Sequence, residues 1–560
     1  MTRHVPQERV AHGAHPLRAG WDGWTVGALV IALIVAVPLV AVIGIAFFPR
    51  ENIWPHLIST TLPRYLGNSL GLMALVGTIS AAIGTGAAWL VVMTDFPFRR
   101  LLEGLLFAPL AVPAYIAAYA LVDLLEYAGP VQTGLRGLFG WHSARDYWFP
   151  EIRSFWSAGI VLGFALYPYV YLLARAAFRE QSAGALDVAR TLGCGPWRSF
   201  LRVSLPLARP AIVIGTAVAM METLNDFGAV DYFAVQTLTT GIFSVWLEGG
   251  NAGGAAQIAC VSLAVILGLL MIERAGRARR RFHNTARQFR PPMREALRPL
   301  TGWLACALCL IPILIGFVLP VSVMLSHVLG RADLFAGAAL WRAGLHTLVL
   351  SGATAVLALA AGLVLAYGAR LSRHRLLRAL TPLTQLGYAA PGAVVALGVL
   401  IPFAALDNAA ADAVLALTGW DPGLVITGSA AAVVLAYLVR FFAVAQGAMD
   451  SALGRVSPSM DMAARSLGRT PRRVLSEIHL PLMRSSILTA GLVIFVDAAK
   501  ELPATLILRP FNFDTLATLT YNQASLERLD LAAPPALVVV VLGILPLVLM
   551  GRRHGTLAQM

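Results

Sequence analysis

Twelve apolar segments dominate this sequence, and each is long enough to cross a lipid bilayer as a helix. A transmembrane helix needs about 20 consecutive apolar residues. Only 13% of the 560 residues are charged, about half the charged fraction of a soluble protein. The segments lie near residues 24–48, 66–93, 101–127, 155–178, 208–231, 255–273, 300–327, 343–369, 378–405, 423–446, 484–508 and 533–550. The sequence therefore predicts an all-α polytopic membrane protein with about 12 transmembrane helices.

A basic segment between apolar runs occurs twice, in residues 186–207 and again in residues 461–482. Ala189, Arg190, Leu192, Gly193, Pro196, Arg198, Leu205, Pro206 and Leu207 each recur 275 residues later. A period near half the chain length indicates two copies of one large unit rather than a solenoid of short repeats. We therefore expect two homologous six-helix bundles, each with a short helical segment in the repeated loop.

Arginine is concentrated in loops on one side of the predicted membrane. The connection at 274–299 holds nine arginines, whereas the loop at 406–422 carries three aspartates and no lysine or arginine. The positive-inside bias then places both termini and both repeated segments in the cytoplasm. The same bias explains the net charge of +14, so we expect no nucleic-acid partner. The predicted organisation is a cytoplasmic tail at 1–23, a first bundle at 24–273, a basic cytoplasmic linker at 274–299, a second bundle at 300–551 and a cytoplasmic tail at 552–560.

Ionisable residues occur at matching places in the fifth apolar segment of each half. With a shift of 275 residues, Glu222 aligns with Asp497 and Asp226 with Glu501. Residues four apart lie on one face of a helix, and membrane-embedded charges usually face a bundle interior or a watery cavity. We predict that the translocation path or its gate is lined by Glu222, Asn225, Asp226, Asp497, Lys500 and Glu501. The alternative is structural pairing between helices, with Lys500, the only lysine in the chain, neutralising Asp497 or Glu501.

The sequence gives no firm metal site and no catalytic motif. Hard oxygen ligands suit hard cations such as ferric iron, and the weak candidates are Asp226, Asp231, Tyr232 and Glu501. There is no phosphate-binding loop, no HExxH motif and no nucleophile elbow. We therefore expect a transport subunit without enzymatic activity or a bound cofactor. Its energy must come from a partner or from an ion gradient.

The repeated segments resemble the EAA loop of permeases from bacterial ABC importers, which have the type I permease fold. Each has an Ala-x-x-x-Gly pattern with Leu-Pro a dozen residues later. The first copy keeps the acid of the motif at Asp187, whereas the second has Met462 there, beside Asp461. In that family the loop forms a coupling helix that inserts into a groove on an ATPase subunit. The resemblance implies ATPase coupling by Asp187, Ala189, Leu192, Gly193, Trp197, Pro206, Ala464, Leu467, Gly468, Val474 and Pro481.

Most of the docking energy is expected from the packing of four of these side chains. They are Leu192, Trp197, Leu467 and Val474, and they are apolar or aromatic.

Residues 224–233 and 236–243 are similar to those of ferric-iron importer permeases, in which two bundles can be fused in one chain. This similarity implies a binding-protein-dependent importer that moves ferric iron by alternating access between the bundles. Its partners would be a periplasmic substrate-binding protein, near loops 129–153, 231–254 and 509–532, and two copies of a cytoplasmic ATPase that binds ATP and Mg. The location would be the bacterial inner membrane. Alternatives are a thiamine importer, then phosphonate, polyamine or sulfate importers, and an ion-coupled secondary transporter.

Overall fold

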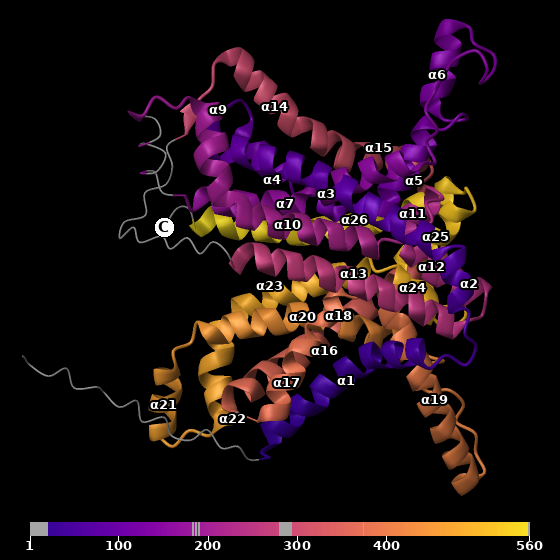
Figure 1. Ribbon diagram of the computed structural model, residues 1–560, viewed down its shortest axis with the longest axis vertical. Coiled ribbons are helices and arrows are strands. Elements are labelled where there is room, and N and C mark those ends of the chain that lie inside the picture. Colours follow the sequence, from indigo (N-terminus) through magenta and orange to yellow (C-terminus); the bar gives the residue numbers. More distant parts are fainter. Residues whose placement is uncertain are drawn as a thin grey trace, which may run out of the picture.

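The computed structural model describes residues 21–181, 184, 188, 191–278, 294–372 and 374–557 of an almost entirely helical protein (Figure 1). Within these residues, 10 helices are long and apolar enough to cross a membrane. A pair bent by 92°, Arg99–Ala111 and Ala114–Phe139, adds an eleventh span if it is counted as one. The shorter apolar stretch Leu529–Leu545 belongs to the last helix. The prediction of an all-α polytopic protein with about 12 spans is confirmed.

The first half contains the following helical elements in chain order. They are α1 (Gly23–Phe47), α2 (Trp54–Ser59), α3 (Leu62–Met93), α4 (Arg99–Leu105), η1 (Ala108–Ala111), α5 (Ala114–Leu125), α6 (Pro130–Phe139), α7 (Phe155–Arg179), α9 (Pro196–Ser199), η2 (Phe200–Ser204), α10 (Leu205–Asn225), α11 (Gly228–Tyr232), α12 (Leu238–Phe243), η3 (Ser244–Glu248) and α13 (Ala252–Ala278).

The second half repeats this order with small differences. Its elements are α14 (Pro299–Ile313), η4 (Leu314–Val318), α15 (Leu319–Val328), η5 (Ala332–Phe335), α16 (Ala338–Leu371), α17 (Arg375–Thr384), α18 (Leu386–Ala389), α19 (Gly392–Thr418), α20 (Ala430–Gly454), α21 (Pro458–Ser466), α22 (Pro471–Val474), η6 (Leu475–His479), α23 (Leu480–Ala499), α24 (Pro503–Leu508), α25 (Leu516–Ser525) and α26 (Leu529–Leu557). A short parallel strand pair, β1 (Thr94–Asp95) with β2 (Glu295–Ala296), joins the loop after α3 to the end of the predicted linker.

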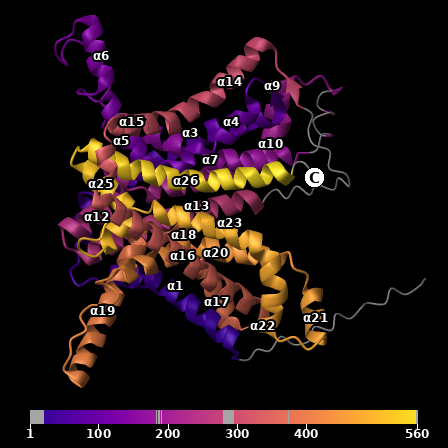
Figure 2. The same cartoon turned by 180° about the vertical axis from the view of Figure 1, so that it is seen from behind.

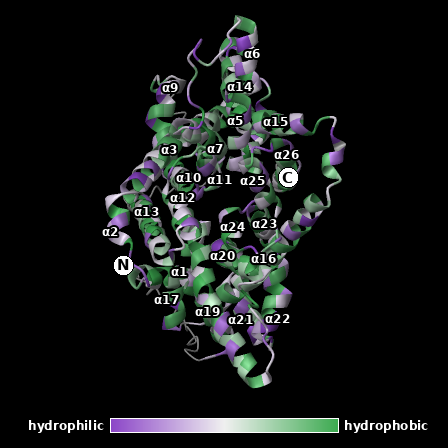
Figure 3. Cartoon of the chain, turned by 90° about the vertical axis from the view of Figure 1, so that its right-hand side faces the viewer, coloured by the Kyte–Doolittle hydropathy of each residue, from purple (hydrophilic) through white to green (hydrophobic). Residues whose placement is uncertain are grey.

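Several predicted spans have different ends or breaks in the structure: the span expected at 101–127 is divided among α4, η1 and α5, and the span expected at 423–446 lies at Ala430–Gly454. The spans expected at 208–231 and 484–508 are each broken, because α10 stops at Asn225 and α23 stops at Ala499 before a short helix follows. The span expected at 378–405 starts in α17 and continues as α19 to Thr418. The alanine-rich sequence 404–417 favours this extension, since alanine has the highest helix propensity. The extended end of α19 projects from the body of the molecule (Figures 1 and 2), and α6 projects at the other end of the long axis (Figures 1 and 3).

The first long helical segment of each half packs against the other half. α1 runs along α16, α17 and α19, and the segment α14–α15 runs along α4, α5 and, through η4, α7 (Figures 1 and 2). The backbones approach closely at these crossings. A Cβ at Gly398 would collide with the carbonyl of Pro38, and a Cβ at Gly316 would collide with that of Phe164. The repeat defines two copies along the chain, but in space the copies exchange their first helices.

Candidate translocation site and coupling segments

Both predicted acidic helices are interrupted at their charged residues, so that Asp226, Lys500 and Glu501 lie within the breaks. α10 ends at Asn225 and α11 starts at Gly228, while α23 ends at Ala499 and α24 starts at Pro503. Proline is favoured in the first turn of a helix because it has no N–H to leave unbonded. The interruptions therefore place carboxylates beside the exposed N–H groups of two short helices.

The acids within each break accept hydrogen bonds from these N–H groups. Asp226 Oδ1 accepts hydrogen bonds from the N–H groups of Ala229 at 3.0 Å and Val230 at 3.1 Å. Glu501 Oε1 accepts one from the N–H of Ala504 at 3.3 Å. The first N–H groups of a helix have no partner within it, and an acidic side chain stabilises them. The preserved acid at these repeat positions thus has a structural role in both halves.

Two ion pairs lie in the second half, one half-buried and one buried. Lys500 Nζ is 2.9 Å from Asp497 Oδ1, and Arg440 Nη1 is 3.3 Å from Glu501 Oε1. Arg440 and Glu501 have side chains that are only 10% and 5% exposed. Of the two partners expected for Lys500, the structure selects Asp497. The charges of Asp497 and Glu501 are therefore both compensated within their own half.

All six predicted path residues line one cavity of about 130 Å³ between the two halves. Glu222, Asn225 and Asp226 reach it from α10 and the break after it, and Asp497, Lys500 and Glu501 reach it from α23 and the break after it. α5 and α7 contribute mostly apolar and tyrosine side chains, and α20 contributes Arg440 and Phe441. The structure thus brings together residues that lie 275 positions apart, as the repeat suggested.

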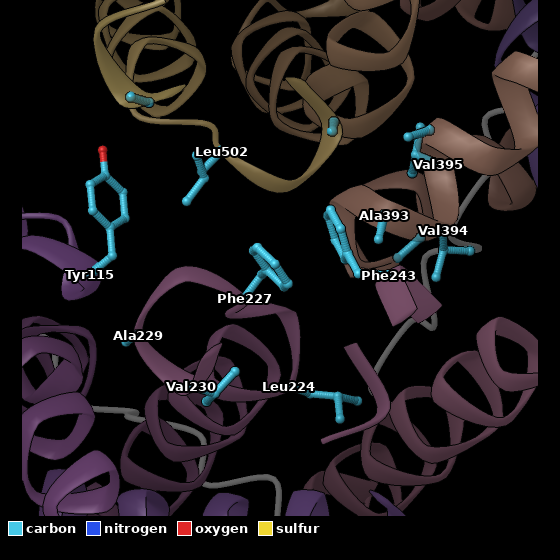
Figure 4. Close-up of a cluster of buried hydrophobic side chains, with 14 of the residues drawn as sticks. Tyr115, Leu224, Phe227, Ala229, Val230, Phe243, Ala393, Val394, Val395 and Leu502 are labelled. Atoms are coloured by element: carbon cyan, nitrogen blue, oxygen red, sulfur yellow. The ribbon is translucent and has the colours of Figure 1, made fainter. Parts of the chain in front are cut away.

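Bulky apolar side chains from both halves border the same cavity. Tyr115 of α5, Phe227 of the first break and Leu502 of the second break surround a common space in Figure 4. All three are buried, at 4%, 6% and 1% exposure. The charged groups are therefore held beside a dry apolar cluster, where electrostatic interactions are stronger than in water.

Two lining residues, Arg440 and Tyr115, were absent from the sequence-based prediction. Arg440 is the single charge within the apolar first two-thirds of α20, and that isolation was a usable signal because membrane-embedded charges are costly. Comparison of the two halves did not identify Arg440, because the equivalent residue of the first half is Ala165. Tyr115 likewise aligns with Ala393, because Pro113 and Pro391 precede α5 and α19 at matching places.

We predict that Asp226→Ala lowers the free energy of unfolding by about 1–2 kcal/mol, because two N–H groups of α11 lose their acceptor. Asp226→Asn keeps an oxygen acceptor and should retain most of that stability while lowering uptake several-fold. Thermal unfolding of the purified variants and uptake into proteoliposomes separate the two effects. If Asp226→Asn were as unstable as Asp226→Ala, the capping role would be wrong.

The four weak metal candidates do not converge on one site. Asp226 and Glu501 line the cavity, whereas Asp231 accepts a hydrogen bond from the Tyr521 hydroxyl at 2.7 Å. Tyr232 packs edge-on against Tyr119, with 4.4 Å between the ring centroids. Among the described residues, no group of three or more His, Cys, Asp or Glu side chains is arranged to hold a metal ion.

The second repeated segment forms a short helix with a defined glycine end. α21 stops at Ser466, and Gly468 follows with a φ of +78°. The N–H of Arg469 donates to the carbonyl of Ala464 at 3.0 Å, which closes a Schellman turn. In the first copy Gly193 has a φ of +75°, so both copies need glycine at this place.

The predicted coupling residues lie in different environments. Leu192, Trp197 and Leu467 are 77%, 63% and 81% exposed, so each repeated segment presents apolar side chains that a partner could cover. Pro206 and Pro481 lie in the first turns of α10 and α23. Asp187 and Ala189 lie outside the described residues.

The exposure expected for Val474 was wrong. Its side chain is 1% exposed and that of Ala464 is 6% exposed, so neither can carry docking contacts on this surface. α22 and η6 turn back toward the spans, and Tyr367 of α16 donates a hydrogen bond to the carbonyl of Pro471 at 2.8 Å. Val474 therefore packs inside the chain and supports the segment from within.

Asp461, the acid beside the second EAA-like motif, also faces the chain itself. Arg370 Nε donates to Asp461 Oδ2 at 3.0 Å, and His479 Nε2 lies 2.8 Å from Asp461 Oδ1. Arg370 also donates to the carbonyls of Leu453 and Val456 at the end of α20. One arginine thus links the coupling helix α21 to α16 and to α20, which carries Arg440.

The sequence of residues 77–281 matches the model of the binding-protein-dependent transport system inner membrane component family. The molybdenum transport system permease protein ModB of Escherichia coli K12 is 32% identical over 227 residues, which are 37% of this chain and 94% of ModB. The chain belongs to this family. It is therefore a multi-pass inner-membrane permease of an ABC importer.

Two further relatives show how this family member is built. The Fe(3+)-transport system permease protein FbpB 2 of Haemophilus influenzae is 23% identical over 501 residues, which cover 87% of this chain and 90% of FbpB 2. The sulfate transport system permease protein CysT of E. coli K12 is 28% identical over 251 residues, or 43% of this chain and 86% of CysT. The match to FbpB 2 spans both halves, which confirms the fused two-bundle organisation, while ModB and CysT have the length of one half.

Proposed function

We propose that this chain imports ferric iron as the permease subunit of an ATP-driven, binding-protein-dependent transporter. The observation that carries the proposal is the match to FbpB 2 over both halves, because an iron permease shares the fused organisation of this chain. The molybdenum and sulfate relatives match 37% and 43% of the chain.

The charges of the cavity support a cationic cargo. It is lined by four carboxylates, Glu222, Asp226, Asp497 and Glu501, and by two cations, Arg440 and Lys500. Both cations are paired with carboxylates of their own half. An oxyanion in this space would meet uncompensated negative charge in a setting of low dielectric, whereas a cation would neutralise it.

The mechanism follows from the coupling segments and the cavity. Two ATPase copies, which bind ATP and Mg, dock on residues 186–207 and 461–482 from the cytoplasm and contact Leu192, Trp197 and Leu467. Their closure moves the segments, and Arg370 transmits the motion to α20 and the ion pair beside the cavity. The cavity then opens alternately toward a periplasmic receptor and toward the cytoplasm. Both chain termini lie on the cytoplasmic side.

Oxyanion import is the second candidate, because ModB shares 32% identity with this chain. The test reconstitutes the permease with its ATPase and receptor in proteoliposomes and measures ATP-dependent uptake of radiolabelled ferric iron, with molybdate in a parallel assay. We expect iron to accumulate and molybdate not to accumulate. Molybdate uptake without iron uptake would refute the iron proposal and leave the importer assignment intact.

A further inference from the structure

Two buried side-chain oxygens of the first half border the cavity and have no hydrogen-bond partner in the part of the chain that the structure describes. They are Oδ1 of Asn225 and the hydroxyl of Tyr115, and the half-buried carboxylate of Glu222 lines the same cavity. Asn225 and Tyr115 are 3% and 4% exposed. Buried polar atoms nearly always have a partner, so these oxygens are unusual and indicate a ligand.

The second half shows what occupies the equivalent place there. Glu222 corresponds to Asp497, and Asn225 corresponds to Lys500, whose ammonium group lies 2.9 Å from Asp497. The second copy thus carries its own cation beside the carboxylate. In the first copy asparagine replaces that lysine, so the first half supplies no lysine of its own beside Glu222.

We infer that Glu222, Asn225 and Tyr115 form a transit site for a hard multivalent cation, in the position that Lys500 holds in the other half. Carboxylate, amide and phenol oxygens are ligands for hard cations. A single carboxylate gives modest affinity, which suits a site from which the cargo must leave again. The identity of the natural cation as ferric iron rests on the proposed function, whereas the site itself does not.

Terbium(III) luminescence tests the site on the purified full-length chain in detergent, with excitation through tyrosine. We expect saturable binding to the wild-type chain, and Glu222→Gln should weaken it about tenfold or more, because a charged ligand is lost. Asn225→Lys places a lysine where the second half has Lys500, and its positive charge should abolish terbium binding. Tyr115→Phe keeps the ring but removes the hydroxyl, and should weaken binding about threefold.

Glu248→Gln is the matched control, because Glu248 belongs to the same half and does not line the cavity. Its terbium affinity should equal that of the wild type. Thermal unfolding of each variant shows whether a loss of terbium affinity is caused by misfolding. Tyr115→Phe is the substitution that should disturb the fold least. No terbium binding to the wild type, unchanged affinity in Glu222→Gln, or equal loss in Glu248→Gln would overturn the inference.

The terbium assay and the uptake assay fail independently. If the receptor delivers another solute but terbium binding is still weakened by Glu222→Gln, the iron proposal is wrong and the cation site is supported. If iron is imported at the wild-type rate by Glu222→Gln and terbium affinity is unchanged, the site is wrong and the iron proposal stands.

Discussion

We expect the replacement of Gly193 or Gly468 with valine to lower ATP-driven uptake at least about tenfold, while the chain still inserts into the membrane at its normal level. Both glycines have φ near +75°, a region that a β-branched residue adopts only with strain of about 1–2 kcal/mol. A Cβ at either position meets no atom of the chain within 4 Å. The variants therefore disturb the end of the coupling helix and its fit to the ATPase rather than the packing of the permease.

Gly454→Val is the control for this experiment. Gly454 is the last residue of α20, close in sequence to the second coupling segment, and it also has open space around it but no positive φ. Its uptake should stay near the wild-type level. Normal ATP-driven uptake by both Gly193→Val and Gly468→Val would refute the docking role of the repeated segments.

We expect Arg440→Gln to destabilise the folded chain by about 3–5 kcal/mol and to abolish uptake, because Glu501 would be left as an uncompensated buried charge. Adding Glu501→Gln should restore most of the stability, since glutamine keeps an oxygen to accept the N–H of Ala504. Uptake should remain low in the double variant. The measurements are denaturant unfolding in detergent and uptake into proteoliposomes.

The exposed pair Arg331–Asp530 provides the comparison. Its atoms are 3.2 Å apart, but the side chains are 49% and 40% exposed, so Arg331→Gln should cost less than about 1 kcal/mol. An equal loss of stability in Arg331→Gln and Arg440→Gln would contradict the importance of burial at the cavity.

The sequence predicted the elements that depend on composition and repetition. Apolar length located the spans, and the 275-residue shift identified Glu222 and Asp497, which the structure places on one cavity. Features without a counterpart in the other copy were missed. Arg440 aligns with Ala165 and Tyr115 with Ala393, so comparison of the copies gave no signal for them.

Burial within the coupling segments was also beyond the sequence. Val474 is an apolar residue in a basic loop and so was predicted to meet a partner, but a contact inside the chain satisfies the same preference. Likewise, Asp461 stands where an acid could reach an ATPase, yet Arg370 and His479 lie close enough to hold it. Three-dimensional proximity, which no local pattern encodes, decides both cases.

The exchange of first helices has a consequence for how the fused chain is held together. α1 packs against the outside of the second copy, and α14–α15 packs against the outside of the first. Each copy is therefore covered on one side by a helical segment of the other copy. Separating the copies would expose the apolar surfaces that these helices bury. Proteolytic cleavage within residues 274–299 should therefore leave the two copies associated. Covalent fusion then fixes a one-to-one ratio of the copies during synthesis, while this packing, rather than the peptide bond, holds the assembled pair.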